Sequence, residues 1–134
     1  MLVDIRFASR AAPWLLLGCL VACGGSAPTG SVSVETTPSS NAPTDLLSAL
    51  KSHYEGCYKA GLKRDAKLQG KLSYELVDCP ACDAKLDEDT LGDDEVKRCI
   101  LSRVRKDGSK TAGMMMLNGM GNLSLGQQLT FSTE

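Results

Sequence analysis

The sequence predicts a small α+β domain built from two helices and three strands. Two segments have the three-and-four spacing of amphipathic helices, and other segments alternate polar and apolar residues as strands do. The chain has 134 residues, of which 43% are hydrophobic, so it has room for one domain at most. A formal net charge of -1 argues against nonspecific nucleic-acid binding. The sequence has no stretch of 18 apolar residues, which argues against a membrane span.

The N-terminus resembles the signal of a bacterial lipoprotein. Two arginines precede an apolar run over residues 11–22, which stops at Cys23. The motif Leu-Val-Ala-Cys at residues 20–23 is similar to the lipobox, in which a small residue precedes the cysteine that receives lipid. We therefore predict a lipoprotein signal peptide over residues 1–22 and lipidation of Cys23. The alternative is an ordinary signal peptide whose ending contains a cysteine.

Residues 23–44 are predicted to be a flexible tether between the lipid and the folded domain. Gly, Ser, Thr and Pro dominate the segment, and only Val32 and Val34 interrupt its polar character. Gly24, rather than Asp, follows the lipidated cysteine, which favours sorting to the outer membrane. We expect an exported protein that contacts the membrane through its N-terminal lipid and faces the periplasm, with its domain over residues 45–134.

The domain is predicted to open with a helix that ends by Gly70. Apolar residues recur at steps of three and four from Leu47 to Leu62, whereas lysines fill the opposite face. Thr44 follows Pro43 and is predicted to be the N-cap residue, because its hydroxyl could accept a bond from a free amide of the first turn.

A hairpin is predicted after this helix. Residues 71–76 alternate with period two, which places Leu72, Tyr74 and Leu76 on the core side of a strand. Turn-forming residues follow at 78–83, and residues 84–87 resume the alternation, so the two runs can pair.

The second helix is predicted to start after Gly92, where three acidic residues suit the positive end of a helix dipole, and to end near Gly108. A last strand is predicted over residues 122–131, because its leucines and Phe131 share one parity. Residues 108–120 have no clear period. We expect Met114–Met116 to fill the core, with an exposed, adaptable contact surface as the alternative.

Four short motifs lie at characteristic places on these elements: Cys57-Tyr58 on the first helix, Leu68-x-Gly70 before the first strand, Thr90-Leu91-Gly92-Asp93 before the second helix, and Cys99-Ile100 on it. Together they resemble the AgmX/PglI C-terminal domain family of myxobacterial envelope proteins, over about residues 47–106. The resemblance implies a domain similar to the TonB C-terminal domain, with two helices packed side by side on a three-stranded antiparallel sheet.

Six cysteines in so short a chain favour an oxidising compartment. Cys19 lies in the signal and Cys23 at the lipid, so four thiols remain, which allow three pairings. The side-by-side helices that the resemblance implies favour a disulfide between Cys57 and Cys99. Cys79 and Cys82 would then pair with each other.

The spacing of Cys79 and Cys82 also occurs in thioredoxin-like redox dithiols, where a helix dipole lowers the pKa of the thiolate. Acidic residues follow Cys82, and the next segment is predicted to be a strand, so a structural staple across the turn is favoured. A zinc site that uses all four thiols is less favoured, because the oxidising compartment competes for them. The acidic run over residues 86–95 lacks the ligand pattern of a calcium loop.

The remaining residues offer no catalytic motif. His53 is the only histidine, and the chain has neither a Gly-x-Ser-x-Gly nor a His-Glu-x-x-His sequence. We therefore expect no enzyme, no cofactor and no metal, but a lipid-anchored cell-envelope protein that binds another envelope protein or component. The alternative function is a periplasmic thiol-disulfide oxidoreductase that uses Cys79 and Cys82.

Overall fold

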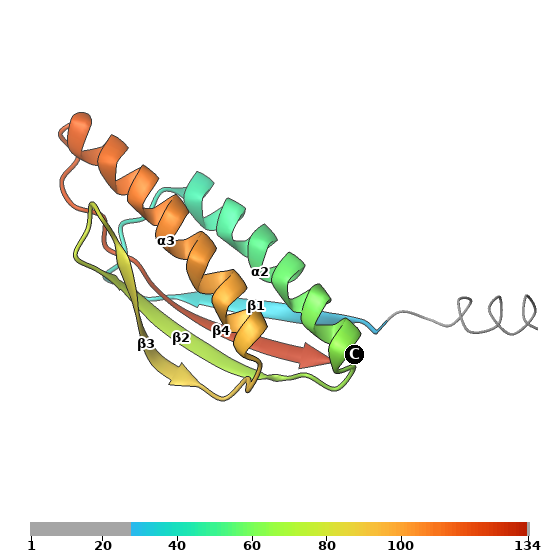
Figure 1. Cartoon of the computed structure of the whole chain (residues 1–134). Helices are drawn as coiled ribbons and strands as arrows, with labels where there is room; N and C mark the ends of the chain where they lie inside the picture. The colour runs from blue at the N-terminus through green and yellow to red at the C-terminus, as the bar shows by residue number, and fades with distance from the viewer. Residues whose placement is uncertain (1–27, 134) are drawn as a thin grey trace, which may run out of the picture.

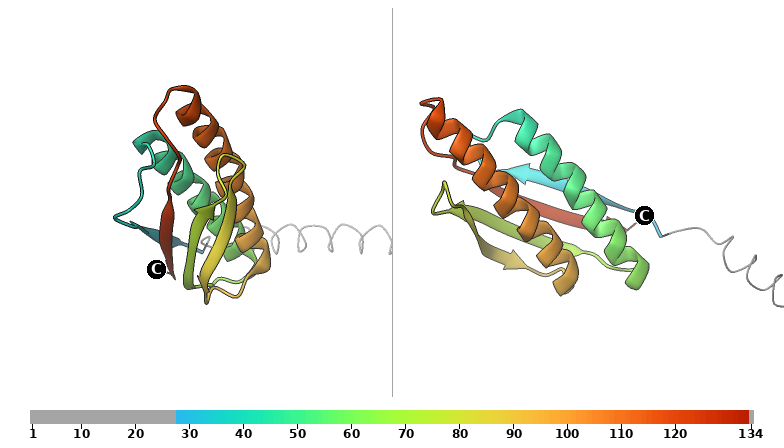
Figure 2. Two further views of the ribbon diagram at one scale, coloured as in Figure 1. Left: turned by 90° about the vertical axis from the view of Figure 1, so that its left-hand side faces the viewer. Right: turned by 45° about the horizontal axis from the view of Figure 1, so that its top comes forward.

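The computed structural model describes residues 28–133, so the predicted signal peptide and Cys23 lie outside the described residues. In this part the elements follow in the order β1 (Gly30–Thr36), α2 (Thr44–Arg64), β2 (Gly70–Val77), β3 (Asp83–Asp89), α3 (Asp94–Leu117) and β4 (Gly126–Thr133). The two helices lie side by side on one face of an antiparallel sheet (Figures 1 and 2). The predicted α+β class with two helices is confirmed over these residues.

The sheet has four strands in the order β1-β4-β2-β3, so the prediction of three strands is wrong. The additional strand, β1, lies inside the segment predicted to be a tether over residues 23–44. It pairs along its whole length with β4, and Val32 stands opposite Phe131 and is buried. The described fold therefore already includes residues 30–36, which the prediction assigned to the tether and not to the domain over residues 45–134.

Helix α2 buries one continuous face, which includes Leu50, Tyr54, Tyr58 and Leu62. The helix begins at Thr44 with Pro43 in the N-cap position, and no side chain caps it. The prediction of Thr44 as the N-cap residue is therefore wrong by one position. The helix ends at Arg64, before Gly70 as predicted.

Strands β2 and β3 form the predicted hairpin, and Leu72, Tyr74 and Leu76 of β2 face the core as expected. The register between the two strands shifts between Ser73 and Tyr74, as at a β-bulge. None of the helices in residues 28–133 is long and apolar enough to cross a membrane.

Helix α3 starts as predicted, because the side chain of Asp93 accepts a hydrogen bond of 2.9 Å from the backbone N–H of Val96. The predicted end near Gly108 is wrong, since the helix continues to Leu117. Gly108 is buried, and a Cβ atom there would lie 2.8 Å from Cδ1 of Leu76. The glycine thus allows α3 to lie close to β2 and does not terminate the helix.

Strand β4 lies at the centre of the sheet, between β1 and β2. It begins at Gly126, so the predicted start at residue 122 is too early, although Leu123 and Leu125 are buried in the preceding segment. Gln127 of β4 is a buried polar residue. Its Oε1 lies 2.5 Å from the hydroxyl of Tyr54 and 2.9 Å from that of Tyr74.

Burial raises the pKa of both tyrosine hydroxyls above its usual value. The Gln127 amide also donates to Oγ1 of Thr36 at 3.1 Å. This polar cluster joins α2, β2, β4 and the end of β1.

Candidate functional site

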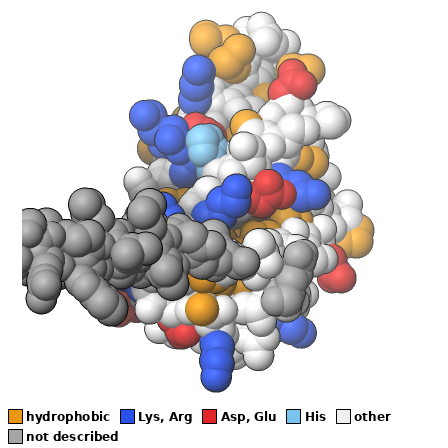
Figure 3. Space-filling model, turned by 90° about the vertical axis from the view of Figure 1, so that its right-hand side faces the viewer, with side chains coloured by type: hydrophobic (Ala, Val, Ile, Leu, Met, Phe, Trp, Pro, Cys, Tyr) orange, Lys and Arg blue, Asp and Glu red, His pale blue; other side chains and the backbone are white. Residues whose placement is uncertain are grey.

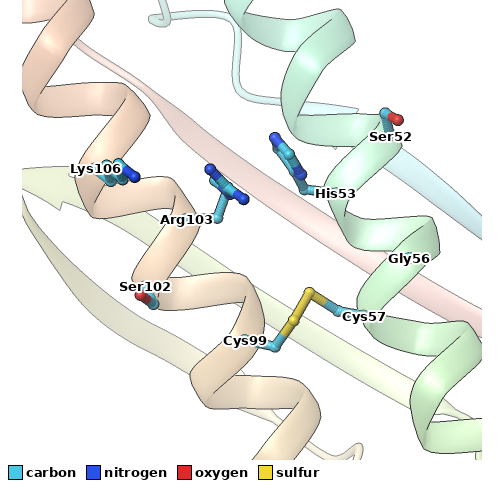
Figure 4. A pocket seen from close by; sticks show the side chains of 8 residues that line it. All are labelled: Ser52, His53, Gly56, Cys57, Cys99, Ser102, Arg103 and Lys106. Atoms are coloured by element: carbon cyan, nitrogen blue, oxygen red, sulfur yellow. A yellow bond between two sulfur atoms is a disulfide. The ribbon is translucent and has the colours of Figure 1, made fainter.

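A disulfide joins the two helices at the surface of the domain. Cys57 of α2 and Cys99 of α3 have Cα atoms 5.9 Å apart, so the predicted pairing is confirmed. Cys57 is buried, whereas Cys99 is exposed. The bond therefore lies on the side of the helix pair that faces away from the sheet, where it forms part of a groove (Figure 4).

This groove between the helices has a volume of about 480 Å³ and basic side chains along it. Arg103 and His53 lie on opposite helices and extend into the space between them, further along the helix pair than the disulfide (Figure 4). Basic side chains lie around the histidine on the surface (Figure 3). Nε2 of His53 lies 3.6 Å from Oδ2 of Asp107. Ser52 and Ser102 point away from His53, so the groove does not have the arrangement of a serine nucleophile and its base (Figure 4).

The second disulfide joins Cys79 and Cys82 in the turn between β2 and β3, as predicted, with Cα atoms 4.0 Å apart. Cys82 is only 6% exposed and packs beside α3, where its Cβ lies 3.9 Å from the position that a Cβ on Gly108 would take. The motif precedes a strand, not a helix, and Asp78 and Asp83 flank it. These surroundings lack the helix N-terminus that lowers a thiol pKa in redox dithiols, and the nearby cation, Arg105, is paired with Asp83 at 2.9 Å.

Four of the six acidic residues in the 86–95 run, Asp89, Asp93, Asp94 and Glu95, form ion pairs with Lys97 or Arg64. Lys97 Nζ lies 3.1 Å from Asp89 and 3.2 Å from Asp94. Asp93 is bound by Arg64 at 2.8 Å, and the Val96 N–H, followed by this guanidinium, lowers the pKa of its carboxyl group. Within residues 28–133, no group of three His, Cys, Asp or Glu side chains is arranged to hold a metal ion.

The two edges of the sheet differ in charge. The β3 edge carries four acidic residues among seven, and two of them, Asp83 and Asp89, form ion pairs with α3. The β1 edge, with the sequence Gly-Ser-Val-Ser-Val-Glu-Thr, carries one acidic residue. Charged residues on an edge strand discourage further strand pairing. The β3 edge is protected in this way, and the β1 edge is not.

Two adjoining grooves run between β1 and α2, with volumes of about 540 and 380 Å³. Val32 and Lys51 line both grooves, so the two grooves adjoin at these residues. We use the name β1 groove for these two grooves together with the edge strand β1 that borders them. Its lining residues on the two elements are Gly30, Ser31, Val32, Ser33, Val34, Thr36, Leu47, Ser48, Lys51, Glu55, Tyr58 and Lys59, with Gln127 from β4.

Sequence reasoning did not identify the β1 groove. The available signal was the alternation of Val32 and Val34 with polar residues, which is the pattern of a short half-buried strand. The predicted cysteine pairs lie outside the groove, and Cys23 lies outside the described residues. Comparisons with models of protein families, with curated proteins and with solved structures found no match to this chain.

Proposed function

We propose that this chain is a non-catalytic, lipid-anchored protein of the bacterial cell envelope that binds a partner protein in the β1 groove. Export and anchoring rest on the basic and apolar N-terminal segment and on the Leu-Val-Ala-Cys motif that ends at Cys23. The two disulfides support this location, because such bonds persist in oxidising compartments. The resemblance to the AgmX/PglI C-terminal domain family also favours the envelope.

The observation that carries the binding proposal is the contrast between the two sheet edges. A free edge strand offers unpaired backbone groups to an added strand, and natural proteins usually block such an edge with charges. Here the β3 edge has acidic residues, whereas the β1 edge is nearly uncharged and lies beside a groove. We therefore assign the binding surface to β1.

The orientation of the β1 backbone follows from its pairing with β4. Thr37 N–H donates to the Gly126 carbonyl at 2.9 Å, and hydrogen-bonded pairs alternate along an antiparallel ladder. With the register of β1 and β4, this alternation turns the backbone groups of Val32, Val34 and Thr36 away from β4. An extended segment of the partner would pair with these groups.

The side chains of that added segment would enter the groove between β1 and α2. Lys51 lines both parts of the groove, and Lys59 lies at one end with Glu55 nearby. Two lysines against one carboxylate favour a partner segment with an acidic side chain. Val32 and Val34 supply apolar contacts for its neighbours.

Substitution of Val34 by Pro tests this surface, because it removes one outward N–H without removing a bond to β4. Leu86→Pro is the matched control. Leu86 is also half-buried. The Leu76 N–H donates to the Leu125 carbonyl, so the backbone groups of Leu76, and of Tyr74 two residues earlier, point toward β4 and not toward β3. Leu86 stands opposite Tyr74, so its N–H faces away from β2. Glu35→Lys and Glu88→Lys form a second pair, with the same exposed substitution on each edge.

The assay is photo-crosslinking in intact cells, with a photoreactive residue at position 33 or, as the control, at position 88. We expect one discrete adduct from position 33 that is lost in Val34→Pro. Glu35→Lys should not weaken the adduct, because a lysine there attracts an acidic segment, and both β3 variants should leave it unaffected. Equal adducts from the two edges, or an adduct that Val34→Pro leaves unchanged, would contradict the assignment. Intact mass measurement tests the anchor: acyl chains on the mature chain should disappear in Cys23→Ser.

The alternative function is a periplasmic thiol-disulfide oxidoreductase that uses Cys79 and Cys82. The burial of Cys82 and the acidic neighbours of the pair favour the structural role instead. Turnover of a disulfide substrate by the wild-type chain, with loss of turnover in Cys79→Ser, would support the oxidoreductase. We expect no turnover.

A further inference from the structure

The end of α3 carries a group of exposed methionines. Met114, Met116 and Met120 are 56%, 51% and 67% exposed, and Leu117 is 89% exposed. This end of the helix lies at the opposite end of the molecule from the start of β1 (Figure 1). Large apolar side chains that gather on a surface usually serve an interaction, so the cluster requires a physical explanation.

The helix cap brings part of this cluster together. Gly119 has φ of +70°, the Met120 N–H donates to the Met115 carbonyl at 2.8 Å, and the Gly119 N–H donates to the Met116 carbonyl at 3.2 Å. These two bonds define a Schellman motif, which reverses the chain and places the residue after the glycine against the last helical turn. Met120 is thereby folded back toward Met115.

Three methionines consequently line one pocket of about 260 Å³. They are Met114, Met115 and Met120, and the pocket also has Asp45 from the first turn of α2. Met115 is buried and lies at the bottom of the pocket, whereas Met114 and Met120 are exposed and accessible from solvent. It shares no lining residue with the β1 groove.

We propose that Met114, Met115 and Met120 form a binding site for Cu(I). Thioether sulfur is a soft, neutral ligand that suits Cu(I) and is a poor ligand for hard cations such as Mg²⁺ or Ca²⁺. The four cysteines of the described residues are all in disulfides, so the thioethers are the soft ligands left there. Asp45 places a carboxylate beside the site, which compensates the charge of a monovalent cation.

Leucine substitution separates metal binding from apolar contact, because Leu keeps the apolar volume and removes the sulfur. The test uses the full chain with Cys19→Ser and Cys23→Ser, which removes the thiols outside the disulfides. Cu(I) is titrated under anaerobic conditions against a chromophoric Cu(I) chelator, with ascorbate as the reductant. Met116→Leu is the matched control, since Met116 is an exposed methionine of the same turn that does not line the pocket.

We expect one Cu(I) per chain with sulfur ligation in its X-ray absorption spectrum. Met114→Leu and Met120→Leu should each weaken binding by about tenfold or more, since even outer-shell partners of a metal contribute that much, and Met116→Leu should not. The triple variant Met114→Leu/Met115→Leu/Met120→Leu should lose binding altogether. If it folds poorly because Met115 is buried, the Met114→Leu/Met120→Leu double variant decides, because both of its residues are exposed. Absence of Cu(I) binding by the parent chain, unchanged binding in the double variant, or an equal loss in Met116→Leu would overturn the proposal.

Discussion

The two disulfides should contribute unequally to stability, because they close loops of very different length. Cys57 and Cys99 are separated by 42 residues, and Cys79 and Cys82 by 3. We compare Cys57→Ala/Cys99→Ala with Cys79→Ala/Cys82→Ala. Each double variant removes one buried and one more exposed sulfur, so the loss of packing is similar in the two and largely cancels in the comparison.

The magnitude follows from the entropy that each bond removes from the unfolded chain. In the chain-entropy relation, a loop of this length gives about 4 kcal/mol for the Cys57–Cys99 bond. The same relation gives about 1.5 kcal/mol for the Cys79–Cys82 bond. Since small domains are stable by about 5 to 15 kcal/mol in total, loss of the first bond removes a large share and loss of the second does not.

Urea unfolding of the full chain under non-reducing conditions measures both losses, with the wild type as reference. We expect a decrease in the free energy of unfolding of about 4 kcal/mol for the helix pair and about 1.5 kcal/mol for the turn pair. Equal losses, or a larger loss for the turn pair, would refute the reasoning from loop length. In that case the packing of Cys82 beside α3 would be the dominant contribution.

Two further predictions test the packing and the capping of α3. Gly108→Ala should destabilise the fold by about 1 to 3 kcal/mol, because its Cβ would lie 2.8 Å from Cδ1 of Leu76. Gly113→Ala is the control, because its Cβ would meet open space, and it should be neutral or slightly stabilising. Equal effects of the two variants in urea unfolding would contradict this. Asp93→Ala should cost about 1 kcal/mol at neutral pH through loss of the N-cap. The pKa of Asp93 is lowered in the fold, so its stabilisation is complete above the unfolded pKa of about 3.9 and is lost as the pH falls through the folded value. The difference between wild type and Asp93→Ala should therefore shrink in acid, and a constant difference would exclude the charged cap as its cause.

The features that the sequence predicts correctly are those set by neighbouring residues. The face of α2, the alternation in β2 and the acidic start of α3 depend on side chains a few positions apart, and all three agree with the structure. The pairing of Cys57 with Cys99 follows from their places on two helices that the family resemblance implies to be adjacent, and the structure confirms it. Local periodicity and one implied contact were sufficient for this part of the fold.

The errors arise where a distant contact decides the local structure. Strand β1 has few apolar residues, and its order comes from pairing with β4 near the other end of the chain. A glycine such as Gly108 often ends a helix, so the sequence predicts an end there. In the structure Leu76 lies so close that only a residue without a side chain fits at this position inside α3. Neither contact is visible in a window of neighbouring residues, and the β1 groove depends on the first of them.

Because β1 already begins at Gly30, the segment between the domain and the proposed anchor is shorter than the tether predicted over residues 23–44. If Cys23 carries the lipid, the seven residues 23–29 connect it to Gly30. Fully extended, they span at most about 25 Å, at 3.3 to 3.6 Å per residue. The domain would therefore stay close to its membrane with the start of β1 nearest to it, and the methionine end of α3 would lie on the opposite side (Figure 1). On this geometry the β1 groove is accessible to a partner that is itself at the membrane surface, whereas the methionine pocket is open to the soluble contents of the compartment.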